Sequence, residues 1–162
     1  MKKEIKSKIE IAIFSMGCFW KPELLFSKTS GVLKTLVGYS GGNLKNPSYE
    51  EISSRKTGHA ESVKIEFDPK KISYKELLEI FWTHHNPTTI NQQGPDVGSQ
   101  YRSIIFYTNE KQKKEAEKSK EEKQEIYKLP IVTEIRKAED FYPAEEYHQK
   151  YLEKRGMKSC SF

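Results

Sequence analysis

The chain alternates short apolar runs with polar stretches that carry glycine or proline, and the runs have two different periods. Residues 62–67 (SVKIEF) alternate apolar and polar side chains, which is typical of a half-buried strand. After the predicted N-cap Ser73, apolar side chains recur at helical spacing: Leu77, Leu78, Phe81 and Trp82. The other runs predict strands at 8–14, 32–39, 102–107 and 131–136, and helices at about 18–28, 109–126 and 143–154.

The order of these elements favours an α+β fold. Strand, helix, strand, strand, helix and strand follow one another, which is the split βαβ plan of a ferredoxin-like sandwich. We expect a mixed sheet with helices packed on one face; a doubly wound sheet is the alternative. The chain is long enough for one domain with its own core, so we predict a single domain over 1–162. Within it, residues 155–162 are expected to form a mobile tail.

Two long polar stretches, at 43–61 and 88–100, are predicted to be loops. Structureless loops of this length are uncommon in compact domains and are often functional. They carry, together with the tyrosine directly after the second stretch, a set of acids, a histidine, an amide and phenols: Tyr49, His59, Glu61, Asp96, Gln100 and Tyr101. Each is an ordinary solvated residue when taken alone, but together they are able to deliver a proton or stabilise a developing oxyanion.

Composition excludes several classes of protein. Hydrophobic residues make up 35% and aromatic residues 12%, which argues against a disordered chain. The net charge of +5 is modest, and residues 110–125 hold six lysines and six glutamates, so we expect a solvated helix there and no nucleic-acid surface. The first apolar run is too short and polar for a signal peptide or membrane span.

Cys18 and Cys160 are the two cysteines, too few for a secreted disulfide scaffold, so we expect a cytoplasmic protein. The strand–glycine–cysteine–helix order places Cys18 in the first turn of a helix, where unpaired N–H groups favour the thiolate. Phe19 and Trp20 form either an apolar pocket beside the thiol or ordinary core. Burial as a small hydrophobe is the alternative for Cys18 itself. No histidine has zinc-ligand spacing, so no metal is expected.

Six segments of the chain together resemble one enzyme family. They are GCFWKPE (17–23), GYSGG (38–42), NPSYEE (46–51), TGHAESV (57–63), HHNPTTINQQGPDVGSQYRS (84–103) and EEYHQKYL (145–152). Their order and spacing are similar to those of the class A peptide methionine sulfoxide reductases, from about Ile11 to Cys160. The resemblance implies an oxidoreductase, a peptide-methionine (S)-S-oxide reductase, that repairs oxidised proteins by reducing the S epimer of methionine sulfoxide.

The resemblance also implies residue roles. Cys18 matches the nucleophile, and Glu61 matches the acid that protonates the sulfoxide oxygen; a carboxyl group beside apolar rings keeps its proton near neutral pH. The remaining matches are Tyr49 and Tyr101 as hydrogen-bond donors to that oxygen, Asp96 in the active-site network, and Phe19 and Trp20 around the substrate methyl group.

A resolving thiol follows from the same resemblance. Cys160 matches the cysteine that forms a disulfide with the Cys18 sulfenic acid, and thioredoxin or another dithiol then reduces this redox-active disulfide. The expected partners are therefore thioredoxin and oxidised proteins, peptides or free methionine sulfoxide. Neither a bound cofactor nor nucleic acid or a membrane is expected, and we predict a monomer.

The chain departs from the family pattern at a few positions. Lys21 and Arg55 stand where the family usually has glycine, and HHNPT and NQQG replace the more usual HDPT and NRQG. None of these changes removes a predicted catalytic group. Two other functions stay open: a different thiol redox activity, such as a peroxidase, and a non-catalytic module that binds methionine sulfoxide or a peptide. A nucleic-acid-binding role is the least favoured alternative.

Overall fold

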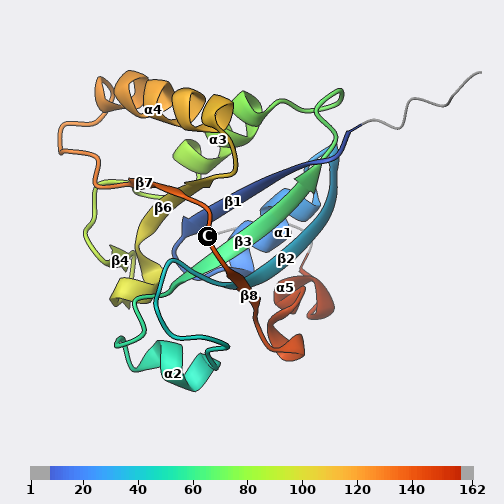
Figure 1. Cartoon of the computed structure of the whole chain (residues 1–162), viewed down its shortest axis with the longest axis vertical. Helices are drawn as coiled ribbons and strands as arrows, with labels where there is room; N and C mark the ends of the chain where they lie inside the picture. Colours follow the sequence, from blue (N-terminus) through green and yellow to red (C-terminus); the bar gives the residue numbers. More distant parts are fainter. Residues whose placement is uncertain (1–7, 158–162) are drawn as a thin grey trace, which may run out of the picture.

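The computed structural model describes residues 8–157, which form a six-stranded sheet with helices packed on it (Figure 1). Every pair of neighbouring strands is antiparallel except β6 and β7, which are parallel. In spatial order the strands are β7 (Glu134–Lys137), β6 (Ser103–Tyr107), β1 (Glu10–Met16), β3 (Ala60–Phe67), β2 (Val32–Ser40) and β8 (Phe141–Pro143). The predicted mixed sheet is therefore confirmed.

Strands β6, β1, β3 and β2 are the ferredoxin-like centre of the sheet. The chain crosses from β1 to β2 through α1 (Trp20–Ser27) and from β3 to β6 through α3 (Tyr74–Thr83). A further helix, α4 (Glu110–Gln124), lies beside α3 at the top of Figure 1 and connects β6 to its parallel neighbour β7. The predicted ferredoxin-like α+β fold is confirmed, and β7 and β8 extend it at both edges.

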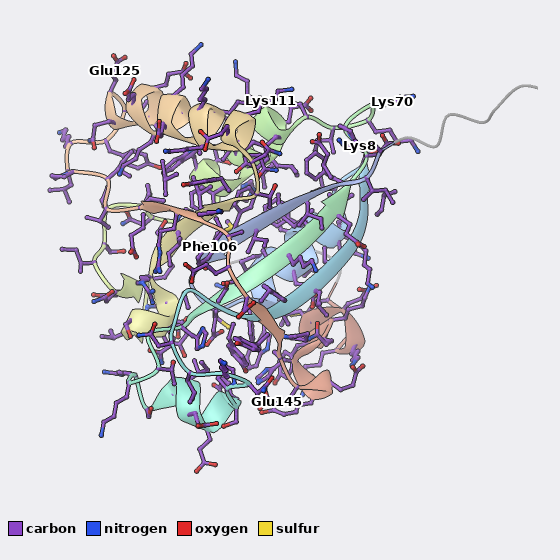
Figure 2. The ribbon with its side chains drawn as sticks, viewed as in Figure 1. Lys8, Lys70, Phe106, Lys111, Glu125 and Glu145 are labelled. Carbon is purple, nitrogen blue, oxygen red and sulfur yellow. The ribbon has the colours of Figure 1, made fainter. Side chains whose placement is uncertain are left out.

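The core lies mainly between the sheet and these three helices. Phe14 of β1 is fully buried there, and its ring packs 5.8 Å from Phe26 and 5.1 Å from Phe81. Successive residues of a strand point to opposite faces of a sheet, so neighbouring Ile13 belongs to a smaller cluster on the other face. That cluster includes Phe106, labelled at the centre of Figure 2. With both faces covered, β1 offers a rigid support for the residues that follow it.

The predicted helix over 143–154 is wrong. Residues Phe141–Pro143 form the edge strand β8, and after it come only the short 3₁₀-helix η2 (Glu146–His148) and α5 (Tyr151–Lys154). Two features prevent a continuous helix: the backbone of Lys150 is left-handed (φ 53°), and the Gln149 amide binds both backbone groups of Val37 at 3.0 and 2.9 Å. These contacts with β2 hold the segment in an open conformation.

The two predicted loops contain regular structure. The first holds α2 (Tyr49–Ser53), whose N-cap Ser48 forms a capping box with Glu51, and β3 begins at Ala60, so that Glu61 lies on a strand. The second holds the hairpin β4 (Gln92–Gln93) and β5 (Asp96–Val97), followed by the 3₁₀-helix η1 (Ser99–Tyr101).

The other predicted elements are confirmed, with shifted ends. The helix after Ser73 begins with a second capping box, and α4 is capped by Asn109. The predicted tail over 155–162 lies mostly outside the described residues, which end at 157. Within 8–157, no helix has both the length and the apolar character needed to cross a membrane.

Candidate active site

Cys18 lies in the short connection between β1 and α1. Phe19 is the N-cap of α1, so Cys18 precedes the helix and is not in its first turn as predicted. Gly17 allows this connection, because its φ is 94° and a Cβ atom there would lie 2.8 Å from the side chain of Gln93. The backbone turns sharply at Gly17 and leaves the Cys18 side chain partly exposed.

The environment of Cys18 opposes ionisation of its thiol. Burial raises the pKa of Cys18 from 9.0 to about 12, and the charges of Glu61 and Asp96 act in the same direction. A hydrogen bond from the Trp20 backbone lowers this pKa, but by less. The expectation of a stabilised thiolate is therefore wrong for the free protein, because burial outweighs the adjacent helix. At neutral pH, Cys18 is a thiol.

Glu61 supplies a protonated carboxyl group to the same place. It lies on β3, opposite Tyr39 of β2, and only 2% of its surface is exposed. Burial raises the pKa of Glu61 to about 8, although a hydrogen bond from the Phe19 backbone N–H to Glu61 Oε1 (3.3 Å) opposes this change. Below that pH the carboxyl group carries its proton, so Glu61 is a proton donor near the Cys18 thiol.

Tyr49, Tyr101 and Asp96 complete the cluster. They lie on α2, η1 and β5, far apart in the sequence. Burial raises the pKa of both tyrosines above the usual range, with Glu61 as the second cause, and the charges of Cys18 and Asp96 also raise that of Tyr101. The phenols therefore stay neutral donors. The charges of these groups act on one another, so the structure brings Tyr49, Tyr101 and Asp96 into one cluster with Cys18 and Glu61, while the roles that the resemblance implies for them stay predictions.

His59, the remaining candidate of the first loop, contacts the backbone through both of its ring nitrogens. Its Nδ1 accepts a hydrogen bond from the Gly42 N–H at 3.0 Å, and its Nε2 lies 2.6 Å from the Leu44 carbonyl oxygen. Both ring nitrogens are therefore occupied by the glycine-rich turn that follows β2. His59 holds this turn against the start of β3 and is not available for chemistry.

Two aromatic residues, Phe19 and Trp20, follow Cys18 at the start of α1. Phe19 is 1% exposed and packs against Tyr39 at 5.8 Å, so it is a buried part of the core. Trp20 is half-buried and is held at two places: its Nε1–H donates to His148 Nδ1 at 3.1 Å, and its indole stacks on Tyr151 at 3.7 Å. The indole of Trp20 thus has a fixed orientation and forms an aromatic wall, with His148 and Tyr151 as a second layer behind it.

His148 and Tyr151 are not among the predicted site residues, although both lie in the segment EEYHQKYL. His148 is 1% exposed, and burial lowers its pKa, so the ring is neutral. Because Nδ1 accepts from Trp20, we assign the ring proton to Nε2, which has no partner among the described residues. The match of EEYHQKYL to the family pattern was the only signal in the sequence for these two residues. Their role as supports of Trp20 is seen only in the tertiary contacts.

Two of the departures from the family pattern, Lys21 and Arg55, stand at positions where glycine is usual. Lys21 is an exposed residue in the first turn of α1, and its charge slightly lowers the pKa of Cys18. Arg55 follows α2 with a left-handed backbone (φ 66°), a conformation that glycine adopts more readily than other residues. The local backbone therefore accounts for the glycine that is usual at this position.

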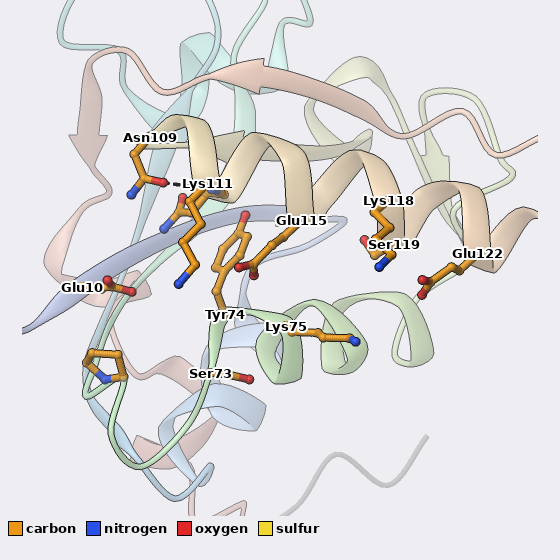
Figure 3. Close-up of a pocket in the computed structure, with 12 residues that line it drawn as sticks. Glu10, Ser73, Tyr74, Lys75, Asn109, Lys111, Glu115, Lys118, Ser119 and Glu122 are labelled. Atoms are coloured by element: carbon orange, nitrogen blue, oxygen red, sulfur yellow. Dashed lines mark hydrogen bonds between the residues drawn. The ribbon is translucent and has the colours of Figure 1, made fainter.

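A separate cleft of about 360 Å³ lies between α3 and α4 (Figure 3). Tyr74, Lys75, Lys111 and Glu115 are among the residues that line it, and none of the predicted site residues is. Figure 3 shows the Tyr74 side chain pointing toward α4, and its buried hydroxyl group lacks a hydrogen-bond partner in the described part of the chain. Across 8–157, no three His, Cys, Asp or Glu side chains gather as metal ligands would.

Cys160 lies outside the described residues, so its predicted approach to Cys18 stays a prediction. Within the described residues, a thiol faces a protonated carboxyl group, two phenols and an aromatic wall. These groups define a site for thiol-dependent redox chemistry, in which the protein itself supplies both the nucleophile and the proton.

The comparisons with known proteins agree with this class. A family model described as "Peptide methionine sulfoxide reductase" matches residues 10–162, and the chain belongs to this family of oxidoreductases. A protein of Methanosarcina acetivorans named "Peptide methionine sulfoxide reductase MsrA" is 56% identical over 151 residues, covering 92% of this chain and 80% of its own length.

Solved structures from Saccharomyces cerevisiae are similar to the whole fold. The reduced form of Mxr1 has a TM-score of 0.88 and 36% identity, covering 96% of this chain and 90% of that one. Mxr1 in complex with Trx2 has a TM-score of 0.64 and 26% identity, covering 93% and 92% of the two chains.

Proposed function

We propose that this protein reduces the S epimer of methionine sulfoxide, free or within proteins, to methionine, with Cys18 as nucleophile and Glu61 as proton donor. The observation that carries the proposal is the buried Glu61 carboxyl group, which holds its proton up to a pH of about 8 in the cluster that contains the Cys18 thiol. Sulfoxide oxygen is a poor leaving group until it is protonated, so a thiol alone is not sufficient.

The two phenols fit the oxygen of the substrate. Tyr49 and Tyr101 stay neutral because burial and the nearby carboxyl groups raise the pKa of each. They therefore donate hydrogen bonds to the sulfoxide oxygen without adding a charge that would repel it. Asp96, whose charge raises the pKa of Glu61, helps to keep the proton on that carboxyl group.

The transfer of oxygen from the sulfoxide to Cys18 needs no external oxidant or reductant. Cys18 Sγ bonds to the sulfoxide sulfur, Glu61 gives its proton to the oxygen, and the proton lost by Cys18 restores Glu61. In the net reaction the oxygen passes to Cys18, which becomes a sulfenic acid, and methionine leaves. The substrate sulfur gains two electrons and the Cys18 sulfur loses two.

Trp20 orients the substrate in this proposal. Its position two residues after Cys18 in the chain and its fixed indole plane suit contact with the S-methyl group, and aromatic rings make favourable contacts with sulfur. A peroxidase is the weaker alternative, because hydrogen peroxide has no methyl group for this wall to hold.

Recycling of Cys18 is proposed to use Cys160 and thioredoxin. The Cys160 thiol attacks the sulfenic acid, water leaves, and a disulfide forms; a dithiol then reduces it by exchange. The solved complex of Mxr1 with the thioredoxin Trx2 supports this choice of reductant. A monomeric state and a cytoplasmic location stay predictions, which sedimentation and cell fractionation would test.

The test is turnover of the separate S and R epimers of N-acetyl-methionine sulfoxide, first with dithiothreitol and then with thioredoxin. We expect reduction of the S epimer only, no product with Cys18→Ser, and loss of only the thioredoxin-driven rate with Cys160→Ser. Failure of the unaltered protein to reduce either epimer would overturn the proposal. Binding without turnover would favour the module that binds methionine sulfoxide, and rapid peroxide reduction by Trp20→Ala would favour the peroxidase.

A further inference from the structure

We infer that Arg155 is a positioning residue for the substrate pocket: it holds Tyr151 in place, and Tyr151 in turn holds Trp20. The inference rests on the proposed function, in which Trp20 contacts the substrate methyl group. Arg155 is exposed and directly follows α5, and it belongs to none of the segments on which the family resemblance was built.

Three flat groups form one stack. The indole of Trp20 and the ring of Tyr151 lie 3.7 Å apart with only 6° between their planes. On Tyr151, the guanidinium carbon of Arg155 lies 3.5 Å from the ring centroid. Arg155 Nη1 also donates to the Tyr151 carbonyl oxygen at 3.4 Å, which ties both the side chain and the backbone of Tyr151 to the arginine.

Trp20 depends on this support because its own helix gives it little. It is the first residue of α1, and the N-cap of that helix has no side-chain hydrogen bond. The bond to His148 fixes one edge of the indole, whereas Tyr151 covers one face and sets its tilt. If Tyr151 moved away, the Trp20 indole would therefore be able to rotate about its hydrogen-bonded edge.

Tyr151 likewise depends on a side-chain partner, on the ring face that Trp20 does not cover, because its own helix gives it little support. It begins α5, a helix of one turn that follows the left-handed Lys150, so its position is set by few backbone contacts. The Lys150 N–H is bound by Glu23 of α1, which anchors the start of the turn. Arg155 anchors its end, and its planar guanidinium stacks on an aromatic face as an ammonium group does not.

The first experiment measures a single turnover, so that the recycling steps do not contribute. Reduced enzyme is mixed with excess N-acetyl-methionine sulfoxide without reductant, and methionine formation is followed as a function of substrate concentration. For Arg155→Ala we expect the half-saturating concentration to rise about two- to fivefold, the ratio typical of an exposed cation–π contact, with an unchanged limiting rate. Lys154→Ala, which removes the neighbouring exposed cation, is the matched control and should match the unaltered protein.

A double-mutant cycle tests whether Arg155 acts through Tyr151. Tyr151→Ala should raise the half-saturating concentration by at least as much as Arg155→Ala, and adding Arg155→Ala to it should cause no further change. Tyr151→Phe keeps the stack and should behave like the unaltered protein, whereas Arg155→Lys should recover only part of the lost affinity. Additive effects of the two alanine changes would overturn the inference.

Two further readouts separate positioning from direct recognition of the substrate. The fluorescence of Trp20, measured against the buried and constant Trp82, should become less anisotropic in Arg155→Ala. The affinity loss should also be equal for methionine sulfoxide peptides with acidic, neutral or basic flanks; a loss confined to acidic peptides would show that Arg155 binds substrate and would overturn the inference. If the unaltered protein makes no methionine at all, the proposed function fails instead.

Discussion

The reactive groups of the site and its aromatic wall rest on very different supports. Cys18 and Glu61 are attached to β1 and β3, two central strands that have a neighbour on each side. Trp20 leans instead on the segment after β8, which contains one 3₁₀ turn and a four-residue helix. Hydrogen bonds of side chains hold this segment, notably the two between the Gln149 amide and the backbone of Val37.

The difference separates chemistry from recognition. Strands inside a sheet open only with the whole fold, whereas a short segment held by a few side-chain bonds can move alone. Changes in the central strands are therefore expected to alter the rate of the chemical step, and changes behind Trp20 to alter substrate affinity. Substitutions at Cys18 and Glu61 test the first expectation, and a substitution at Trp20 tests the second.

The largest effect is expected from Cys18→Ser. A serine hydroxyl at this position has no base that would activate it, because the neighbouring carboxyl group is protonated, so methionine formation should fall below detection. Amino-acid analysis of a single turnover measures this directly. Cys160→Ser is the control and should still make one equivalent of methionine. Methionine formation by Cys18→Ser would remove Cys18 from the mechanism.

Glu61→Gln should leave the thiol in place and remove the proton donor. General acids contribute about 10²- to 10⁴-fold, so the single-turnover rate constant should fall within that range. In the unaltered protein this rate constant should also decline as pH rises past about 8, where Glu61 loses its proton. Stopped-flow measurements from pH 6 to 9 follow both effects. Glu66→Gln, on the same strand, is the control, and a pH profile unchanged by Glu61→Gln would contradict the assignment.

The same carboxyl group predicts how stability depends on pH. The pKa of Glu61 is about 8 in the folded protein and about 4.5 in an unfolded chain, so folding favours the protonated form. This stabilisation is complete below pH 4.5 and is lost as pH rises through 8. The total loss is about 5 kcal/mol in the free energy of unfolding, because each pH unit between the two pKa values is worth about 1.4 kcal/mol. Urea unfolding at pH 5 and 9 measures it. Glu61→Gln should remove this part of the pH dependence, and an equal dependence in both proteins would contradict the prediction.

The smallest of these effects is expected at the wall. Trp20→Ala removes the aromatic surface that we assign to the S-methyl group, and burial of one methyl group is worth about 0.8 kcal/mol. The half-saturating substrate concentration should therefore rise about fourfold, because about 1.4 kcal/mol corresponds to a tenfold change, while the limiting rate changes less. Trp20→Phe keeps a ring and should lie between the two. A fall in the limiting rate alone would place Trp20 among the reactive groups and would end the separation of chemistry from recognition.

The supports also differ in how far they could be predicted. The strand over 62–67 and the helix after Ser73 follow from local patterns, and the structure confirms both. The segment over 143–154 has helical residues but no helix, because Gln149 binds the backbone of a strand more than 100 residues away. No local pattern contains that contact.

The site shows the same limit. The order of residues around Cys18 correctly indicates a strand before it and a helix after it, but it wrongly puts Cys18 in the first turn of that helix. It also does not give the burial that keeps the thiol protonated. The gathering of Glu61, Asp96 and the two tyrosines came from the resemblance, since nothing in their spacing brings the two predicted loops together. The layer behind Trp20 needed the structure, because stacking and hydrogen-bond partners depend on tertiary packing.

The two edge strands of the sheet affect whether the protein aggregates with oxidised, partly unfolded proteins. Exposed strand edges are templates for other chains, and partly unfolded proteins supply strands that pair with them. Here one edge is the four-residue β7, with Glu134, Arg136 and Lys137, and the other is the three-residue β8, which ends at Pro143. Short, charged and proline-bearing edges resist such pairing, so the enzyme is expected to stay dispersed in the presence of the unfolded proteins that oxidation produces.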